Sequence, residues 1–175
     1  MKTTGLLTIL FLLLAGLAAG QQVKWDYSKV AARASESVDV NLDGSMLRLA
    51  TKFLSDDDDN EAQVKKLVAG LKGIYVKSFE FKNPGEYSAA DVEAFRSQLR
   101  APEWQRIINV HSKEDGENVE VFIKAEGKSI GGLAIIATEP KELTLVNIVG
   151  PIDLDNLSEL GGHFGIPDVE VEKKK

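Results

Sequence analysis

Two histidines and a run of aspartates are the side chains whose types most suggest chemistry. His111 and His163 would need a positioned partner to act as a general base, and no Gly-x-Ser-x-Gly motif supplies a serine nucleophile. The run Asp56–Asp59 offers oxygen ligands that suit Ca²⁺, but it lacks the alternating spacing of an EF-hand loop. Ser129 lies in a Lys-Ser-Ile-Gly-Gly stretch without the Lys-Ser/Thr ending of a phosphate loop. These motifs therefore predict no catalytic residue, no metal ligand and no cofactor.

Two other classes of function stay open at this point. A hydrolase or lyase that uses carboxylates together with His111 requires this histidine in a concave pocket beside an acid. A carrier of a small apolar ligand requires a cavity of about 300 Å³ or more between the sheet and its helices.

The elements that must position these side chains follow from hydrophobic periodicity. Alternation predicts about five to six mostly antiparallel strands, at residues 37–42, 74–81, 106–112, 118–126, 132–138 and 143–149. Helical spacing predicts a short helix around 26–34, helices ending near 54, 71 and 99, and a last helix at 154–160. The last four strands read as a meander. The fold class is α+β, with three to four helices packed mainly on one face of the sheet.

Three details of these elements can be compared with the structure. Asp43 is expected to cap the first of the longer helices, and Ser88 with Asp91 to form a capping box for the third. The hydrophobic residues of the first of these helices are expected to share one face. They are Met46, Leu47, Leu49, Ala50, Phe53 and Leu54.

Two strands of the meander, 132–138 and 143–149, carry apolar side chains on both faces, whereas 118–126 is apolar on one face apart from Phe122. Strands that are apolar on both faces need cover on both faces. We expect an apolar patch on the side away from the main helices, formed by Ile107, Phe122, Ile136, Val146 and Ile148. A patch left open on an exported protein marks an interaction site. The alternative is that an N-terminal arm, residues 21–35 with Trp25 and Tyr27, or the C-terminal helix covers this side.

The first twenty residues have the three-part pattern of a secretory signal peptide. Lys2 provides the charge, residues 6–18 form an apolar core, and Ala18-Ala19-Gly20 are small. This core is shorter than the about 20 apolar residues of a membrane-spanning helix. We predict cleavage between Gly20 and Gln21, export to the periplasm or the extracellular space, and no integral membrane span in the mature chain. The alternative is an uncleaved membrane anchor.

The net charge and the lack of cysteine limit the kinds of partner and of chemistry that are open to the chain. Removing residues 1–20 removes one lysine, so 20 basic and 27 acidic residues remain, a net charge of −7. This acidic balance argues against nucleic acid or an anionic bilayer as the main partner. The chain has no cysteine, which excludes disulfides, thiolate chemistry and a lipid-modified cysteine. The 155 mature residues fit one domain at 36–167 with a charged tail at 168–175.

Residues 45–50, 70–81 and 143–155, together with Gly161-Gly162, resemble a family of exported bacterial proteins described only as a domain of unknown function. The resemblance extends over about residues 35–167. It implies a protein of the bacterial envelope and carries no activity, cofactor or catalytic residue. The resulting hypothesis is a non-catalytic interaction or regulatory module, whose partner is an envelope protein or a second copy of the chain.

Overall fold

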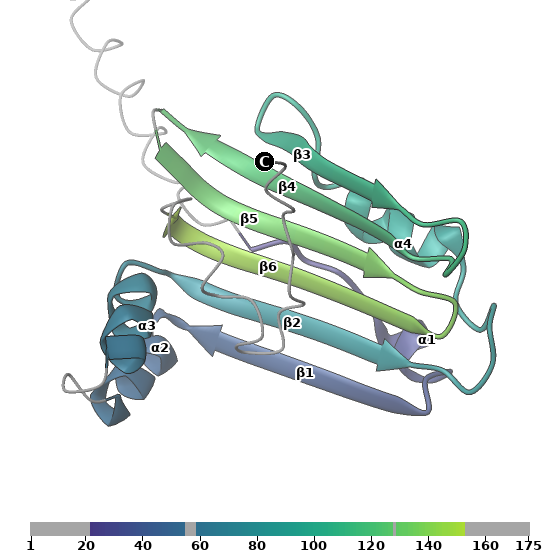
Figure 1. The fold of residues 1–175 in the computed structure, drawn as a ribbon, viewed down its shortest axis with the longest axis horizontal. Coiled ribbons are helices and arrows are strands. Elements are labelled where there is room, and N and C mark those ends of the chain that lie inside the picture. The colour runs from purple at the N-terminus through teal and green to yellow at the C-terminus, as the bar shows by residue number, and fades with distance from the viewer. Residues whose placement is uncertain (1–21, 55–58, 128, 153–175) are drawn as a thin grey trace, which may run out of the picture.

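One antiparallel sheet of six strands organises the chain (Figure 1). The computed structural model describes residues 22–54, 59–127 and 129–152. The strands are β1 (Glu36–Asp43), β2 (Gly73–Glu80), β3 (Trp104–His111), β4 (Asn118–Glu126), β5 (Ser129–Thr138) and β6 (Glu142–Ile152). Their order across the sheet is β1-β2-β6-β5-β4-β3. The last four strands form the predicted meander, and the α+β fold class is confirmed.

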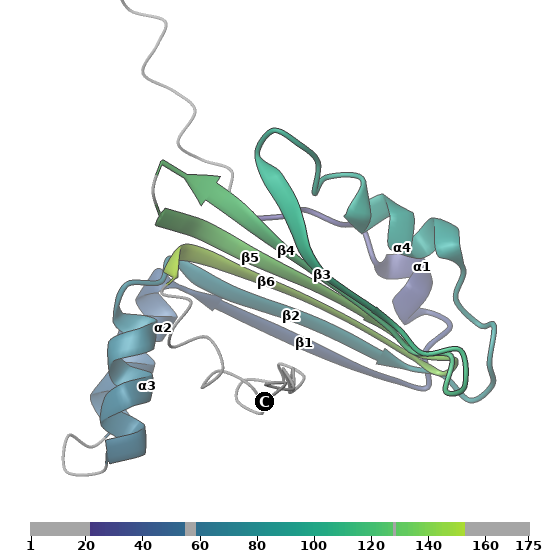
Figure 2. The same cartoon turned by 45° about the horizontal axis from the view of Figure 1, so that its top comes forward.

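Two pairs of helices lie at different places around this sheet. They are α1 (Ser28–Ala31), α2 (Gly44–Ala50), α3 (Asp59–Ala69) and α4 (Ala89–Arg96), with a 3₁₀ turn η1 (Thr51–Phe53) continuing α2. Figure 2 shows α1 and α4 over one face, while α2 and α3 stand at one end and project to the other side. The expected helix at 154–160 and most of the run Asp56–Asp59 lie outside the described residues.

Both predicted caps are confirmed. The Asp43 carboxylate accepts hydrogen bonds from the backbone N–H groups of Ser45 and Met46 at the start of α2. Ser88 and Asp91 form a reciprocal capping box at the start of α4. These contacts satisfy N–H groups that a helix leaves without partners in its first turn.

The face beneath α4 holds the aromatic half of the core, which we call the α4-side core. Its buried members come from the five strands β2 to β6, from the residue that follows β2, from α1 and α4, and from the turn after α4. They are Val30, Phe79, Phe81, Val92, Phe95, Leu99, Trp104, Phe122, Ala134, Ile136, Leu143 and Leu145. The N-terminal arm also packs here. The Trp25 ring contacts the rings of Phe79 and Phe95 edge-on, with distances between ring centroids of 5.9 and 6.3 Å. The arm therefore packs on the same face as α4, and not on a face away from the main helices as the alternative had it.

The opposite face holds an aliphatic group, the α3-side core. Leu47 from α2, Val68 from α3 and Leu71 from the turn after α3 pack against one end of it. The strands contribute the remaining buried members, Ile74, Val76, Val121, Leu133, Ile135, Val146, Ile148 and Ile152. The sheet is therefore apolar on both faces, as the meander strands predicted. No helix in the described ranges is long and apolar enough to cross a membrane.

Candidate functional site

The five residues of the expected patch do not lie together. Phe122 and Ile136 are buried in the α4-side core, whereas Val146 and Ile148 are buried in the α3-side core. The reason is the register: Ile136 pairs with Leu145 and Val146 pairs with Ile135, which places Ile136 and Val146 on opposite faces. Ile107 lies at a bulge of the edge strand β3 and is 43% exposed. The structure therefore replaces the single patch by two buried cores and one exposed isoleucine.

His111 does not have the surroundings of a general base. It is exposed at the end of β3, and within the described residues its ring has no hydrogen bond or ion pair. His163 lies outside the described residues. The described part of the chain also holds no group of three or more histidines or carboxylates arranged to bind a metal ion. A general base needs a positioned partner, so the exposed position of His111 argues against the hydrolase or lyase hypothesis.

The buried carboxylate of Glu120 is held between two arginines. Glu120 is 3% exposed; Arg96 donates to it from Nε at 2.8 Å, and Arg106 from Nη1 at 2.7 Å. Arg96 lies at the end of α4 and Arg106 on β3, so this cluster joins the helix to the edge of the sheet. Both oxygens of this buried carboxylate are occupied by arginines of the chain itself, which leaves neither free to contact a substrate. We interpret the cluster as structural.

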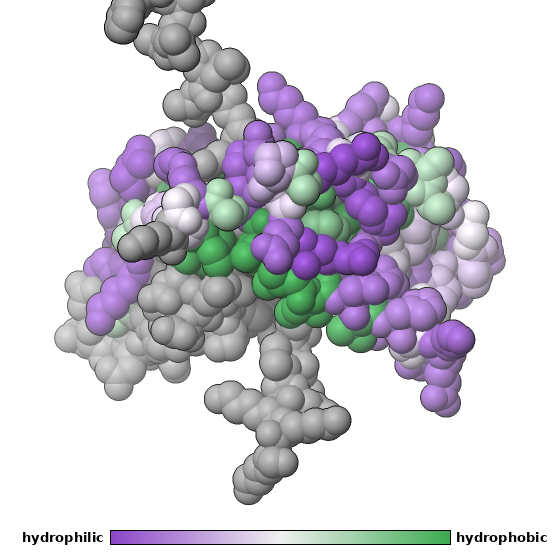
Figure 3. All heavy atoms as spheres, turned by 90° about the horizontal axis from the view of Figure 1, so that it is seen from above, coloured by the Kyte–Doolittle hydropathy of each residue, from purple (hydrophilic) through white to green (hydrophobic). Residues whose placement is uncertain are grey.

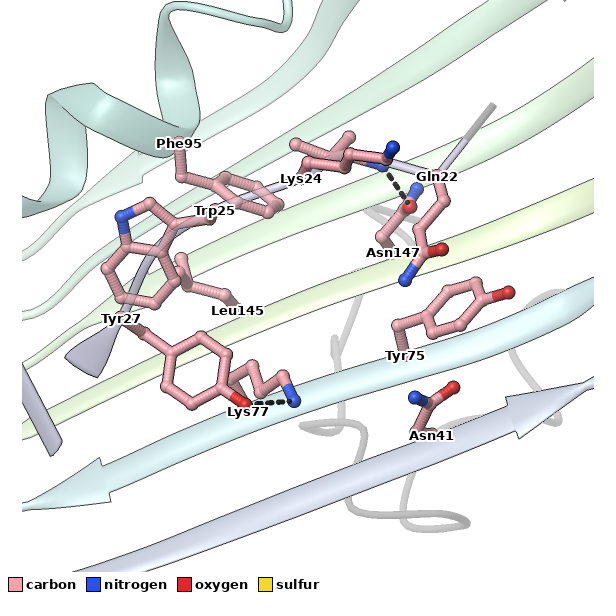
Figure 4. A pocket seen from close by; sticks show the side chains of 11 residues that line it. Gln22, Lys24, Trp25, Tyr27, Asn41, Tyr75, Lys77, Phe95, Leu145 and Asn147 are labelled. Carbon is pink, nitrogen blue, oxygen red and sulfur yellow. Dashed lines mark hydrogen bonds between the residues drawn. The ribbon is translucent and has the colours of Figure 1, made fainter. Parts of the chain in front are cut away.

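A cavity of about 270 Å³ opens between the N-terminal arm and strands β1, β2 and β6 (Figure 4). Its lining mixes aromatic side chains with three carboxamides, Gln22, Asn41 and Asn147. Carboxamides buried against an apolar ligand would lose hydrogen bonds to water without replacement. The cavity therefore does not fit the expected carrier of an apolar ligand.

The most exposed hydrophobic side chains that are close neighbours in sequence lie on α2 and η1. Phe53 is 81% exposed, and Met46 and Leu49 are each 47% exposed. Their spacing of three and four residues places them on one side of the continuous α2–η1 segment. We call these three residues the α2–η1 stripe. Leu47, by contrast, is 1% exposed and packs into the α3-side core, so the expectation that all the hydrophobic residues of this helix share one face is wrong.

The segment that carries the stripe differs in charge from the rest of the chain. The chain as a whole has a net charge of −6, whereas residues 44–54 contain Arg48 and Lys52 and no acidic residue. Both cations are exposed, and each directly precedes a stripe residue, Leu49 or Phe53. The stripe is therefore a hydrophobic surface with positive charge beside it.

Comparison with protein families gives one match. The family described as Domain of unknown function (DUF4252) matches residues 27–160. The chain belongs to the DUF4252 family. A search of curated proteins and a search of solved structures found no match. The DUF4252 match includes all six strands and helices α1 to α4, so the α2–η1 stripe and the Glu120 cluster both lie in the family domain.

Sequence reasoning did not distinguish the stripe from the core of the DUF4252 domain. Helical spacing places Met46, Leu49 and Phe53 on one face together with Leu47, which is buried. Spacing alone does not say which of these side chains face the sheet and which face the solvent. The sequence signal that marks this segment is the absence of acidic residues from 44–54 in an otherwise acidic chain.

Proposed function

We propose that this DUF4252 protein is an exported, non-catalytic interaction module of the bacterial envelope. Its contact surface is the α2–η1 stripe, and its partner is a protein with an apolar groove bordered by carboxylates. The observation that carries the proposal is the exposure of Phe53, Leu49 and Met46 on one side of one helical segment.

The spacing of the stripe supports a groove as the complementary shape. Helices that dock into hydrophobic grooves present anchors at positions i, i+3, i+4 and i+7. Met46, Leu49, Ala50 and Phe53 have this spacing. Full burial of each large side chain would contribute about 1.5–3 kcal/mol, and exposed aromatic anchors of this kind dominate many protein interfaces.

The charge beside the stripe supports an acidic border on that groove. Arg48 and Lys52 would face carboxylates across the interface, which accelerates association and excludes basic partners. An anionic membrane would attract the same cations, and the test below separates it from a protein partner. A symmetric contact between two copies would bring the cationic segment 44–54 against itself, which disfavours a second copy of the chain as the partner.

The test compares stripe variants with a matched control in cells of the native host. Leu49→Glu and the double variant Arg48→Glu with Lys52→Glu should each reduce the amount of co-purified partner by about 10-fold or more. Val110→Glu is the control. Val110 is 50% exposed, which is close to the 47% of Leu49, but it lies on β3. Circular dichroism checks that each variant is folded.

Three results would overturn the proposal. Equal recovery of the partner with Leu49→Glu would remove the stripe from the interface. Loss with Val110→Glu alone would move the interface to the β3 edge. If only further copies of the chain are recovered, the stripe is a site of self-association. If only lipid is recovered, the stripe binds a membrane.

A further inference from the structure

We infer that the cavity beneath the N-terminal arm is a binding site for an uncharged, hydroxyl-rich molecule of the size of a monosaccharide. The cavity lies on the α4 side of the sheet, away from the α2–η1 stripe, and the inference does not depend on the proposed interface. Four properties of the lining carry it: free polar groups, an apolar wall, balanced charge and a fixed shape.

The polar end of the cavity offers side chains without partners. Asn41 pairs with Tyr75 across β1 and β2, and Tyr75 pairs with Asn147 across β2 and β6, so the three face the same side. Within the described residues, the side chains of Asn41, Tyr75 and Gln22 make no hydrogen bond. Figure 4 shows Gln22, Asn41 and Tyr75 around one end of the cavity. Carboxamides and phenols both donate and accept hydrogen bonds, and ligand hydroxyls do the same.

The other end of the cavity is apolar. Trp25 from the arm, Phe95 from α4 and Leu145 from β6 form this wall (Figure 4). A sugar ring presents C–H groups on its faces and hydroxyls at its rim, and therefore matches a wall of this kind opposite a polar one. The volume of about 270 Å³ is slightly below the range of about 300–1,000 Å³ typical of drug-sized ligands. This limits the ligand to about one sugar ring.

The charges near the cavity are largely balanced. Lys77 forms an ion pair with Asp39 and donates a hydrogen bond to the Tyr27 hydroxyl at 3.1 Å. Tyr27 in turn donates to Asp39 at 2.7 Å. The hydrogen bonds from Lys77 and Tyr27 lower the pKa of Asp39, so this carboxylate stays ionised and neutralises Lys77. Lys24 is exposed at the rim. The interior therefore selects for a neutral ligand.

Contacts of the N-terminal arm with β6 and with the turn after α4 hold one wall of the cavity in place. Asn147, 3% exposed, accepts a hydrogen bond from the backbone N–H of Val23 at 2.9 Å. The Gln98 side chain bonds both the N–H and the carbonyl of Lys24, which fixes the next residue of the arm. At the floor, the Tyr75 ring lies over Gly73, where an added Cβ would come within 2.6 Å of the Tyr75 hydroxyl. Such a prearranged site costs little ordering on binding.

The test uses nuclear magnetic resonance titrations of the full mature chain with four probes: D-glucose, D-galactose, D-mannose and N-acetyl-D-glucosamine. At least one should shift the Trp25 indole and the Asn41 and Gln22 amide signals to saturation. Tyr75→Phe should weaken that affinity by about 10-fold, since one hydrogen bond is lost. Asn109→Ala, an exposed site on β3, is the control and should change nothing.

Three results of the titrations would contradict the inference. The first is that none of the four sugars shifts the cavity signals at concentrations up to its solubility limit. The second is that Tyr75→Phe binds with the same affinity as the unaltered chain, which would remove the polar end from the site. Finally, binding of D-glucose 6-phosphate or D-glucosamine without binding of any neutral sugar would assign the cavity to a charged ligand.

Discussion

At the scale of single residues, the buried ion cluster at Glu120 is the sharpest consequence of the fold. An ionised carboxylate in the interior is costly unless it is fully paired, and here both oxygens accept from arginines. Glu120→Gln leaves a neutral amide facing two guanidinium groups. We expect this change to lower the free energy of unfolding by about 2–4 kcal/mol, measured by urea denaturation at pH 7. Glu114→Gln, at an exposed position, is the control and should have almost no effect.

A second prediction for a single residue concerns the contribution of Asp91 to stability at low pH. Burial raises the pKa of Asp91, but hydrogen bonds from Ser88 and the ion pair with Arg33 outweigh burial and lower it below its ordinary 3.8. Because the folded pKa is lower than the unfolded one, the stabilisation is complete above about pH 4. It is lost as the pH falls through the folded pKa.

Asp91→Asn should therefore be less stable than the unaltered chain by about 1 kcal/mol at pH 7. The difference should shrink below about pH 4, as measured by urea denaturation over a range of pH. A constant difference down to pH 2 would show that the carboxylate charge is not what stabilises the start of α4.

At the scale of elements, the junction between β6 and the turn after α3 depends on Gly150. Its φ of +125° is unfavourable for other residues, and an added Cβ would lie 2.8 Å from the backbone nitrogen of Lys72. Gly150→Ala should therefore lower the free energy of unfolding by about 3 kcal/mol or more. Gly85→Ala, at φ +84° with open space around it, should cost only about 1–2 kcal/mol. Equal losses would show that the close approach at Gly150 is relieved by a backbone shift.

The helices and strands also show which features of the fold can be predicted from the sequence. The strand at Asn118–Glu126 and the caps at Asp43 and Ser88 were predicted as observed, because local spacing and side-chain chemistry determine them. The pairing of Ile136 with Leu145 was not predictable, since several registers satisfy the same alternation. The cavity depends on Asn41, Tyr75 and Asn147, which are far apart in the chain, so only the sheet order brings them together.

At the scale of the whole molecule, the surface is largely polar with a few exposed hydrophobic regions. Figure 3 shows, on one side of the molecule, hydrophobic side chains gathered among a largely polar surface. Val110 and Ile107 on β3 are among the exposed hydrophobics, and β3 is an edge strand of the sheet. Edge strands invite pairing with other chains, which is why a β3 variant is the matched control for the interface on α2 and η1.

The proposed export concerns the whole chain and has a direct test. Expression of the full sequence in a bacterial host, followed by fractionation and N-terminal sequencing, should give a chain outside the cytoplasm that begins at Gln21. A chain that keeps residues 1–20 and stays with the membranes would instead support the uncleaved anchor.

Photo-cross-linking in cells of the native host, with a photoreactive amino acid at position 53, probes the proposed interface at its most exposed residue. We expect one adduct with a different protein, mapped to an apolar groove beside acidic residues, and its loss when Leu49→Glu is added. The same probe at position 110 should give no such adduct. An adduct at position 110 but not at position 53, or an adduct at position 53 with lipid or a second copy of the chain, would show that the α2–η1 stripe does not bind a partner protein.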